Sequence, residues 1–547
     1  MKNKFAKFWW VALVVAWFVD FLFWGKTPGI SFPIWVAGFL VGMGILAWRE
    51  ENKPSKLSWI LIFLALLTAA LTSLRAEPFT RFTNGLFSIF LLGLLVMTFE
   101  NGFWIYYRIV DTIAAGFKAA IGSVINPIQL LSSQSQTEEE QTDEDQVSSF
   151  RNFLKKSLPV LRGLLIAIPI VIILGALLAS ADPIFNDRMV EYLKVFDLKK
   201  LPEYFSRAII ILLLSFLISG FYIQVVLLNK KAKKPKTHSP WIKPFLGIVE
   251  SAVVLSCVNA LFLVFISIQF RYFFGGETNI HLSGYTYSEY AVRGFWELVF
   301  VSVLSLGLVL SLGTISKQKQ ISHRRIFSGL GIALLIQVFI ILISAFQRLR
   351  LYESAYGFTR MRTYPHIFIL CLGVLLIITI VLEGINKRGH FGLALIGMMF
   401  IFVLSLGFIN VDQFIAARNI DRAAINKAPM EYDSDRGYVE IVDIDYFSEL
   451  SLDIVPVLIN RYKDENTSKR VHDLLGAELA CREKLLEESP QEYWQSFHFS
   501  VERSRRLIEE HAVSWNQFEV QEEEDSYGWY FVEVDNGNHY CSYPYNW

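Results

Sequence analysis

Long apolar runs separated by short charged loops limit most strongly how this chain can fold. Each run is near the length of about 20 apolar residues that an α-helix needs to cross the hydrocarbon core of a bilayer. Hydrophobic residues make up 53% of the chain, which is more than the core of one soluble domain requires. About eleven runs meet this criterion, at residues 8–24, 32–48, 57–74, 82–99, 164–180, 208–228, 245–269, 295–315, 326–346, 367–382 and 391–409. We therefore predict an all-α polytopic membrane protein.

The runs divide most of the chain into three parts. Residues 1–100 are predicted to form an N-terminal region of about four membrane helices, and residues 158–410 a main membrane region of about seven. Residues 101–157 connect them. Aromatic and charged residues are mixed in 101–121, which is typical of an amphipathic helix lying on the membrane surface. Residues 132–149 are acidic and have no apolar period, so we expect a disordered linker there.

The C-terminal residues 411–547 are polar and are predicted to form a small soluble domain that is mainly helical. Helical patterns occupy 412–423, 446–461, 468–488 and 494–511, with Pro456 marking a break in the second. The final residues are rich in aromatic and branched side chains around Asp535, Asn536 and Gly537. This pattern favours a terminal β-ribbon packed on the helices.

Basic residues in the loops determine the expected orientation. Six lysines fall in residues 230–243, and loops rich in lysine and arginine stay on the cytoplasmic side. With a cytoplasmic N-terminus, nearly every basic loop lies in the cytoplasm, and the odd number of spans places the C-terminal domain outside. The exception is the segment 346–366, which carries four arginines and lies on the outer side.

The segment 346–366 is the candidate site because guanidinium groups and aromatic hydroxyls converge there at the membrane edge. We predict a surface that binds an anionic headgroup or solute. Its residues are Arg348, Tyr352, Tyr356, Arg360, Arg362 and His366. Two alternatives stay open. The arginines reach lipid headgroups without selecting a ligand, or they form a structural ion pair with Asp20 near the end of the first span.

The remaining chemistry of the sequence is limited. We find no Walker loop, no HExxH or GxSxG motif and no Cys or His spacing typical of a metal site, so we expect no cofactor and no metal, and the sequence favours a non-enzymatic role without deciding the question. The formal net charge is zero, which does not indicate nucleic-acid binding. Cys481 and Cys541 are the only cysteines in the domain predicted to face an oxidising compartment, and we expect them to form a disulfide.

Several short groups of residues carry a family resemblance. They are Asp20-Phe21-Leu22-Phe23, Gly29-Ile30-Ser31, Arg348, Leu351-Tyr352, Ala355-Tyr356-Gly357, Thr359, Arg362, Tyr364, His366, Asn410, Asp412, Ile415-Ala416, Asn419-Ile420, Asp443, Tyr446, Leu450-Ser451, Asp453 and Val455-Pro456. In these residues the chain resembles the bacterial DUF4173 membrane proteins, which are related to the DUF4153 group. Phe447 and Ile454 depart from the Leu and Ala expected there. The resemblance covers almost the whole chain and implies a multi-pass protein of the bacterial plasma membrane, but the family has no assigned activity.

Three functions are compatible with these features. The missing motifs favour a non-catalytic envelope protein that senses, scaffolds or assembles partners. The alternative is a transporter or lipid-handling protein, which the many spans and the outer arginines support. The third is an enzyme acting on a lipid-linked substrate, with His366 or Glu353 as acid or base. The expected partners are membrane lipids and envelope proteins, and not nucleic acid.

Overall fold

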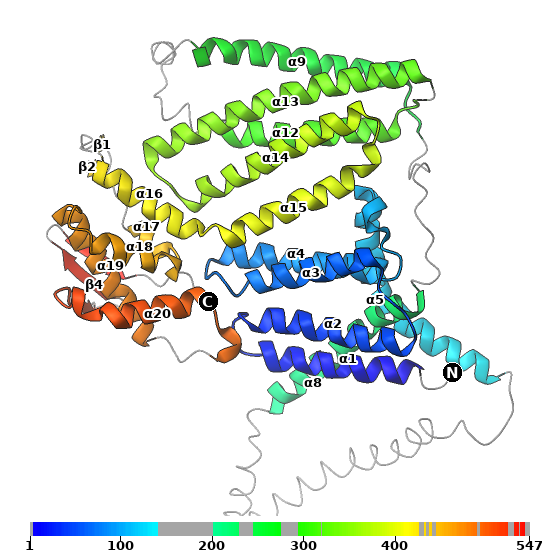
Figure 1. Ribbon diagram of the computed structural model, residues 1–547, viewed down its shortest axis with the longest axis horizontal. Helices are drawn as coiled ribbons and strands as arrows, with labels where there is room; N and C mark the ends of the chain where they lie inside the picture. Colours follow the sequence, from blue (N-terminus) through cyan, green and yellow to red (C-terminus); the bar gives the residue numbers. More distant parts are fainter. Residues whose placement is uncertain are drawn as a thin grey trace, which may run out of the picture. The chain divides into compact units, whose positions relative to one another are not determined.

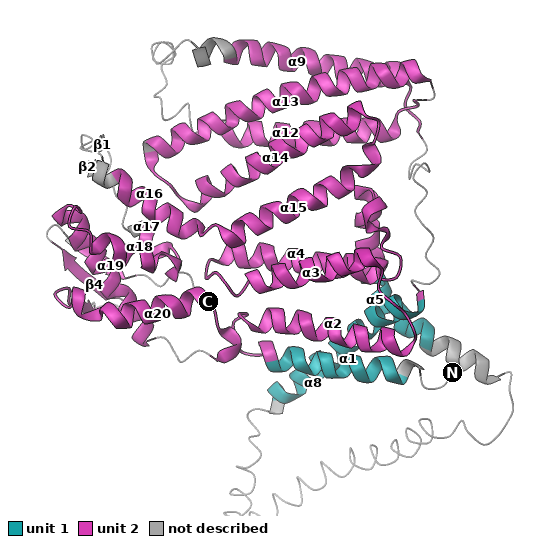
Figure 2. Cartoon of the chain, in the orientation of Figure 1, with its two compact units in different colours: residues 1–21, 120–227 teal, residues 22–119, 228–547 magenta. Residues whose placement is uncertain are grey.

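The computed structural model describes residues 4–139, 201–228, 244–274, 294–318, 320–425, 431–433, 437–439, 445–488, 493–522, 530–534 and 537–541. These residues are mainly helical, with two short antiparallel sheets in the C-terminal part of the chain (Figure 1). The chain divides into two compact units, residues 1–21 with 120–227 and residues 22–119 with 228–547 (Figure 2). The expected span 164–180, the lysine cluster and the acidic linker beyond residue 139 lie outside the described residues.

The first unit contains most of α1 (Lys4–Phe23), the C-terminal part of α5 (Ile109–Glu139), α8 (Leu201–Ile223) and a π-helical turn, Gln224–Leu228. Helices α5 and α8 approach closely at Gly220. A Cβ atom there would lie 2.1 Å from the carbonyl oxygen of Ser123, so only glycine allows this packing. Asn126 Nδ2 donates to the Gly220 carbonyl at 3.3 Å and to Gln224 Oε1 at 3.2 Å. Small residues and interhelical hydrogen bonds of this kind hold helices together in an apolar surrounding.

The second unit contains the other long apolar helices, which pack side by side (Figure 1). Their bounds are α2 (Ser31–Arg49), α3 (Lys56–Leu71), α4 (Pro78–Thr98), α9 (Ile248–Phe274), α12 (Phe295–Ile315), α13 (Ile321–Tyr356), α14 (Arg360–Gly384) and α15 (Phe391–Phe408). Helix α13 packs against α9, α12 and α14, and α15 connects this group to α4 and α3. Phe327, Leu334 and Val338 of α13 are completely buried in this core.

Ten helices in the described part of the chain are long and apolar enough to cross a membrane. The expectation of a polytopic helical protein is therefore confirmed. Helix α3 differs from the span expected at 57–74, because it has 16 residues and a length of about 24 Å. It ends where the hydroxyls of Thr72 and Ser73 donate back to the carbonyls of Ala69 and Ala70. Such local hydrogen bonds compete with continuation of the helix.

Helix α5 also differs from its prediction. The sequence predicted a surface helix over 101–121 followed by a disordered linker, but α5 continues to Glu139. Its part Ile109–Leu130 is apolar enough to span a membrane. The charged residues that suggested a surface helix lie near its start, at Asp111 and Lys118, and the next residues up to Leu130 carry no charge. The helix thus extends through residues 132–139, where a disordered linker was expected.

The C-terminal domain packs helices around a core that includes Phe447, Leu458 and Trp515. Its elements are α16 (Val411–Ile425), α17 (Asp445–Glu449), the 3₁₀ turn Leu452–Ile454, α18 (Val455–Tyr462), α19 (Lys469–Glu488), the 3₁₀ turns Trp494–Ser496 and Ala512–Trp515, α20 (Phe499–His511), and the strands β1 (Glu431–Asp433), β2 (Gly437–Val439), β3 (Val520–Glu522), β4 (Tyr530–Val534) and β5 (Gly537–Cys541). Strands β3, β4 and β5 form one antiparallel sheet in that order, which confirms the terminal β-ribbon. Pro456 lies in the first turn of α18, at the expected break.

The segment 493–499 holds this domain against the loops that flank α2 and α4. The Ile30 N–H donates to the Phe497 carbonyl at 3.0 Å, and the Phe499 N–H donates to the Ser73 carbonyl at 2.9 Å. His498 lies between these two contacts and is only 4% exposed. Burial and the nearby positive charge of Arg81 lower the pKa of His498 to about 3.

We predict that the protein loses stability as the pH falls from 7 to 5. A histidine whose pKa is lowered by folding contributes stability above its unfolded pKa of about 6.5, and this contribution is lost as the pH falls below that value. For His498 the loss between pH 7 and pH 5 is about 2 kcal/mol. The measurement is the unfolding midpoint in detergent as a function of pH.

Two substitutions control this experiment. His498→Gln should flatten the pH dependence, because an amide does not titrate in this range. His472→Gln, at a less buried histidine of the same domain, is the matched substitution with which His498→Gln is compared. Equal pH dependence in the wild type and His498→Gln would contradict the prediction.

Candidate functional site

The arginine-rich segment 346–366 is helical over most of its length, and not the loop that the sequence suggested. Helix α13 continues to Tyr356, and α14 begins at Arg360. The turn between them needs Gly357, which has a positive φ of 78° that other residues rarely adopt. The six predicted site residues therefore lie on the last turns of one helix and the first turns of the next.

Arg360 joins the start of α14 to the C-terminal domain. Its Nε and Nη2 atoms donate to the two carboxylate oxygens of Asp412 at 2.8 and 2.6 Å. Asp412 is fully buried and also accepts the Ser451 N–H at 2.8 Å. The Arg360 N–H donates to the Tyr446 hydroxyl at 2.8 Å. Two of the guanidinium nitrogens are thus occupied by a bidentate ion pair within the protein.

Arg362 closes the C-terminal end of α13. It donates to the carbonyls of Tyr356 and Gly357, both at 2.8 Å, and its Cζ lies 4.1 Å from the ring centroid of Tyr352. The Tyr352 hydroxyl accepts a further hydrogen bond at 3.2 Å. An arginine that satisfies the last carbonyls of a helix and stacks on its aromatic side chains has a structural role.

His366 and Glu353 form a second link between α13 and α14. The His366 Nε2 atom lies 2.7 Å from Glu353 Oε2, and the Glu353 side chain is buried. Arg348, on the preceding turn of α13, is buried as well. Neither His366 nor Glu353 lines the groove described below. The structure thus gives the predicted acid–base candidate a partner, but places both away from that groove.

Asp20 has a different partner from the one that the sequence suggested. Within the first unit, Arg207 Nε lies 3.1 Å from Asp20 Oδ1, and Arg207 Nη2 lies 2.5 Å from Asp20 Oδ2. The Asp20 side chain is 5% exposed. A carboxylate in an apolar helix requires such a partner. Sequence reasoning missed Arg207 because it follows α1 by most of two hundred residues.

A groove of about 1000 Å³ opens beside Arg360 in the second unit. It lies where α4, α12 and α14 begin and where α15 ends. Its lining residues are Glu77, Pro78, Phe79, Trp296, Thr359, Arg360, Met361, Tyr364, Pro365, Phe368, Phe402, Tyr446, Glu449 and Ser451. The polar residues gather at the end near the C-terminal domain, and the apolar ones belong to the membrane helices.

Two polar side chains of the groove, Ser451 and Glu77, differ in their hydrogen bonding. Ser451 is 1% exposed, and its hydroxyl has no hydrogen-bond partner among the residues that the structure describes. The Glu77 carboxylate caps α4 by accepting the N–H groups of Phe79 and Thr80 at 2.8 and 2.6 Å. A buried hydroxyl without a partner is costly in free energy, so a bound group that hydrogen-bonds to Ser451 would be stabilising.

Of the six predicted residues, only Arg360 lines this groove. Glu77, Trp296 and Glu449 also line the groove and were not predicted, because they come from distant parts of the chain. A signal for Tyr446 and Ser451 existed, since both belong to the residues that carry the family resemblance. Spacing along the chain could not have placed them beside Arg360.

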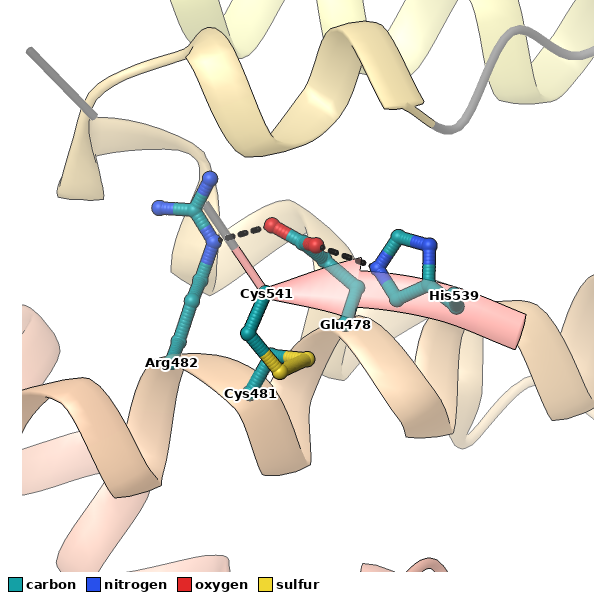
Figure 3. The surroundings of a disulfide bond; sticks show 5 residues. All are labelled: Glu478, Cys481, Arg482, His539 and Cys541. Carbon is teal, nitrogen blue, oxygen red and sulfur yellow. Dashed lines mark hydrogen bonds and ion pairs between the residues drawn. A yellow bond between two sulfur atoms is a disulfide. The ribbon is translucent and has the colours of Figure 1, made fainter. Parts of the chain in front are cut away.

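A buried network holds the C-terminal wall of the groove (Figure 3). Arg482 Nε donates to Glu478 Oε1 at 2.6 Å, and His539 Nε2 lies 2.9 Å from Glu478 Oε2. Burial alone would raise the pKa of the Glu478 carboxyl, but Arg482 and His539 hold this pKa below its usual value. Arg482 also donates to the carbonyls of Phe447, Leu450 and Ser451 at 2.7, 3.1 and 3.2 Å. It thereby fixes the segment that carries Ser451.

The disulfide lies beside this network (Figure 3). Cys481 of α19 is bonded to Cys541 of β5 in the structure, and the two Cα atoms are 5.1 Å apart. Cys481 precedes Arg482, and Cys541 follows His539 by two residues. The crosslink thus holds strand β5 on helix α19, where His539 reaches Glu478.

The helices and the groove define the class of protein. It is a multi-pass helical membrane protein whose C-terminal domain forms one wall of a groove at the ends of its membrane helices. The chain belongs to the family described as Domain of unknown function (DUF4153), whose model matches residues 62–461. This match includes every residue that lines the groove. Comparisons with curated proteins and with solved structures found no match.

We predict that Asp412→Asn destabilises the second unit by about 3–5 kcal/mol, because it leaves the Arg360 charge without its buried partner. The measurement is the unfolding free energy in detergent. The matched control is Asp421→Asn, which breaks an ion pair to Arg461 in which both side chains are more than a third exposed. That change should cost less than about 1 kcal/mol. Similar losses of unfolding free energy in the two variants would show that the buried Arg360–Asp412 pair contributes no more to stability than the exposed Asp421–Arg461 pair.

Proposed function

We propose that this protein is a non-catalytic envelope protein that holds one membrane lipid in the groove beside Arg360. The observation that carries the proposal is the polarity of the groove. One end has charged and hydroxyl groups, and the remainder is lined by Phe79, Trp296, Phe368 and Phe402. An amphiphile presents the same division between headgroup and acyl chain. The proposed function combines the scaffold or sensor function with the lipid-handling alternative.

The depth of the groove fits an acyl chain. Phe368 lies eight residues into α14 from Arg360, which corresponds to about 12 Å along the helix axis. Half of a typical hydrocarbon core is about 15 Å thick. A chain that follows α14 would therefore contact the groove through most of one leaflet. Pockets for small molecules are typically apolar with a few well-placed polar groups, as this one is.

A lipid in the groove would contact two parts of the protein at once. The membrane helices supply the apolar lining, and the C-terminal domain supplies Tyr446, Glu449 and Ser451. A ligand that binds only when both parts are in place stabilises that arrangement. Lipid occupancy could then be transmitted to the soluble domain, which is the property that a sensor or assembly scaffold requires.

We also propose that the protein belongs to the DUF4173 branch and resides in the bacterial plasma membrane, with a cytoplasmic N-terminus and an extracytoplasmic C-terminal domain. The distribution of basic loops supports this orientation. The bonded pair Cys481–Cys541 is in keeping with it, because disulfides persist in oxidising compartments.

We predict that alkaline phosphatase fused after Trp547 is active in cells, since this enzyme folds only on the oxidising side. A matched fusion after Lys317, in a loop expected in the cytoplasm, should be inactive. The measurement is phosphatase activity normalised to the amount of fusion protein. Inactivity after Trp547 together with activity after Lys317 would reverse the proposed orientation.

We predict that a photo-reactive phenylalanine analogue at Phe368 captures a lipid that survives extensive washing with detergent. The control is the same analogue at Leu370, which lies on the same helix, outside the groove, and is 59% exposed compared with 38% for Phe368. Lipids that merely surround the protein should be lost from both positions. The measurement is the intact mass of the irradiated protein, and equal loss or equal retention at the two positions would overturn the proposal.

A further inference from the structure

We propose that the groove selects a lipid whose headgroup is zwitterionic, with a phosphate and a primary ammonium group. This inference rests on the proposed function, because it names the class of lipid that the same groove would hold. It follows from the charges at the polar end, which comprise one arginine and two glutamates, and from the hydroxyl of Ser451.

The phosphate has a donor pair at this end. Arg360 uses Nε and Nη2 for Asp412, but its Nη1 makes no hydrogen bond with any residue that the structure describes. The Arg360 side chain is 21% exposed and lines the groove. The buried Ser451 hydroxyl is a second donor without a partner. Guanidinium and hydroxyl donors are the groups that proteins commonly direct at phosphate oxygens.

The ammonium has acceptors at the same end. Glu449 is exposed at the end of α17, lines the groove and makes no hydrogen bond or ion pair in the described part of the chain. Tyr446, one turn earlier, and Tyr364 on α14 also line the groove. The Glu449 carboxylate can accept hydrogen bonds from the N–H groups of a primary ammonium.

The net charge argues against a headgroup that is only anionic. Asp412 already neutralises Arg360, so the Glu77 and Glu449 carboxylates give the polar end an excess of negative charge. The first turn of α4 compensates Glu77 in part, through two backbone N–H groups. A phosphate alone would therefore approach an uncompensated carboxylate at Glu449. A cation on the same headgroup removes this repulsion.

The test is a competition among three lipids with identical acyl chains and phosphoethanolamine, phosphoglycerol or phosphocholine headgroups, measured on the full-length protein by native mass spectrometry. We expect the phosphoethanolamine lipid to be bound about tenfold better than the phosphoglycerol lipid, the effect of one charged hydrogen bond. The phosphocholine lipid should bind less well than phosphoethanolamine, because its quaternary nitrogen has no N–H to donate.

The decisive variant is Glu449→Gln, which should abolish the preference for phosphoethanolamine over phosphoglycerol. Glu465→Gln is the matched control, since Glu465 is an exposed glutamate of the same domain outside the groove. It should leave the preference unchanged. Because Glu449 is exposed and makes no contact that the fold requires, the variant should fold, which its unfolding temperature verifies.

The outcomes separate the two proposals. If a lipid is captured at Phe368 but the phosphoglycerol lipid binds equally or better, or if Glu449→Gln keeps the wild-type preference, the headgroup inference is wrong and lipid binding stands. If the analogue at Phe368 captures no lipid and none of the three lipids is retained, the proposed function itself is wrong. A preference that disappears only in Glu449→Gln supports both.

Discussion

The buried ion pair between Arg360 and Asp412 is the contact on which the arrangement of the second unit depends. It ties the first residue of a membrane helix to the first turn of the helix that begins the C-terminal domain. Asp412 has no contact with solvent, so its charge is tolerated only because the guanidinium fork and the Ser451 N–H satisfy both oxygens. The groove lies where the membrane helices meet the C-terminal domain, and Arg360 of this ion pair lines it.

The same constraint governs the other charges in the apolar helices. Asp20 is matched by Arg207 and Glu383 by Arg388, whose guanidinium also lies 4.7 Å from the ring centroid of Phe327, and the Glu353 carboxylate lies 2.7 Å from His366 Nε2. The first of these contacts joins α1 to α8, the contact of Glu353 joins α13 to α14, and the contact of Glu383 joins α14 to the turn that follows it. In an environment without water, an unpaired charge would be strongly destabilising, so these pairs also fix which helices become neighbours. Arg360 and Arg362 of the 346–366 segment are bonded within the protein, to Asp412 and to the carbonyls at the end of α13, whereas Asp20, the partner that the ion-pair alternative assigned to them, is paired with Arg207.

A groove that is shared by membrane helices and a soluble domain gives a lipid a particular role. The network of Glu478, Arg482 and His539 positions the segment carrying Tyr446, Glu449 and Ser451, and the disulfide lies directly beside it. The soluble wall is therefore held from behind by a rigid domain. A lipid headgroup in front of it would complete the hydrogen bonding of Ser451 and balance the carboxylate of Glu449. On the function proposed above, such binding would connect membrane composition to the C-terminal domain.

The sequence by itself determined the class of the fold. Apolar runs near 20 residues have few solutions other than membrane helices, and the change to polar residues after position 410 predicted the C-terminal domain and its β-ribbon, because backbone groups must be satisfied differently in lipid and in water. Local signals failed for α3 and α5, where capping hydroxyls and an apolar continuation decided the ends. The tertiary structure alone decided the partners of Asp20 and Arg360 and brought Glu77, Trp296 and Glu449 into one groove. Ion pairs and grooves depend on distances between helices that are remote in sequence, and no local pattern of residues specifies those distances.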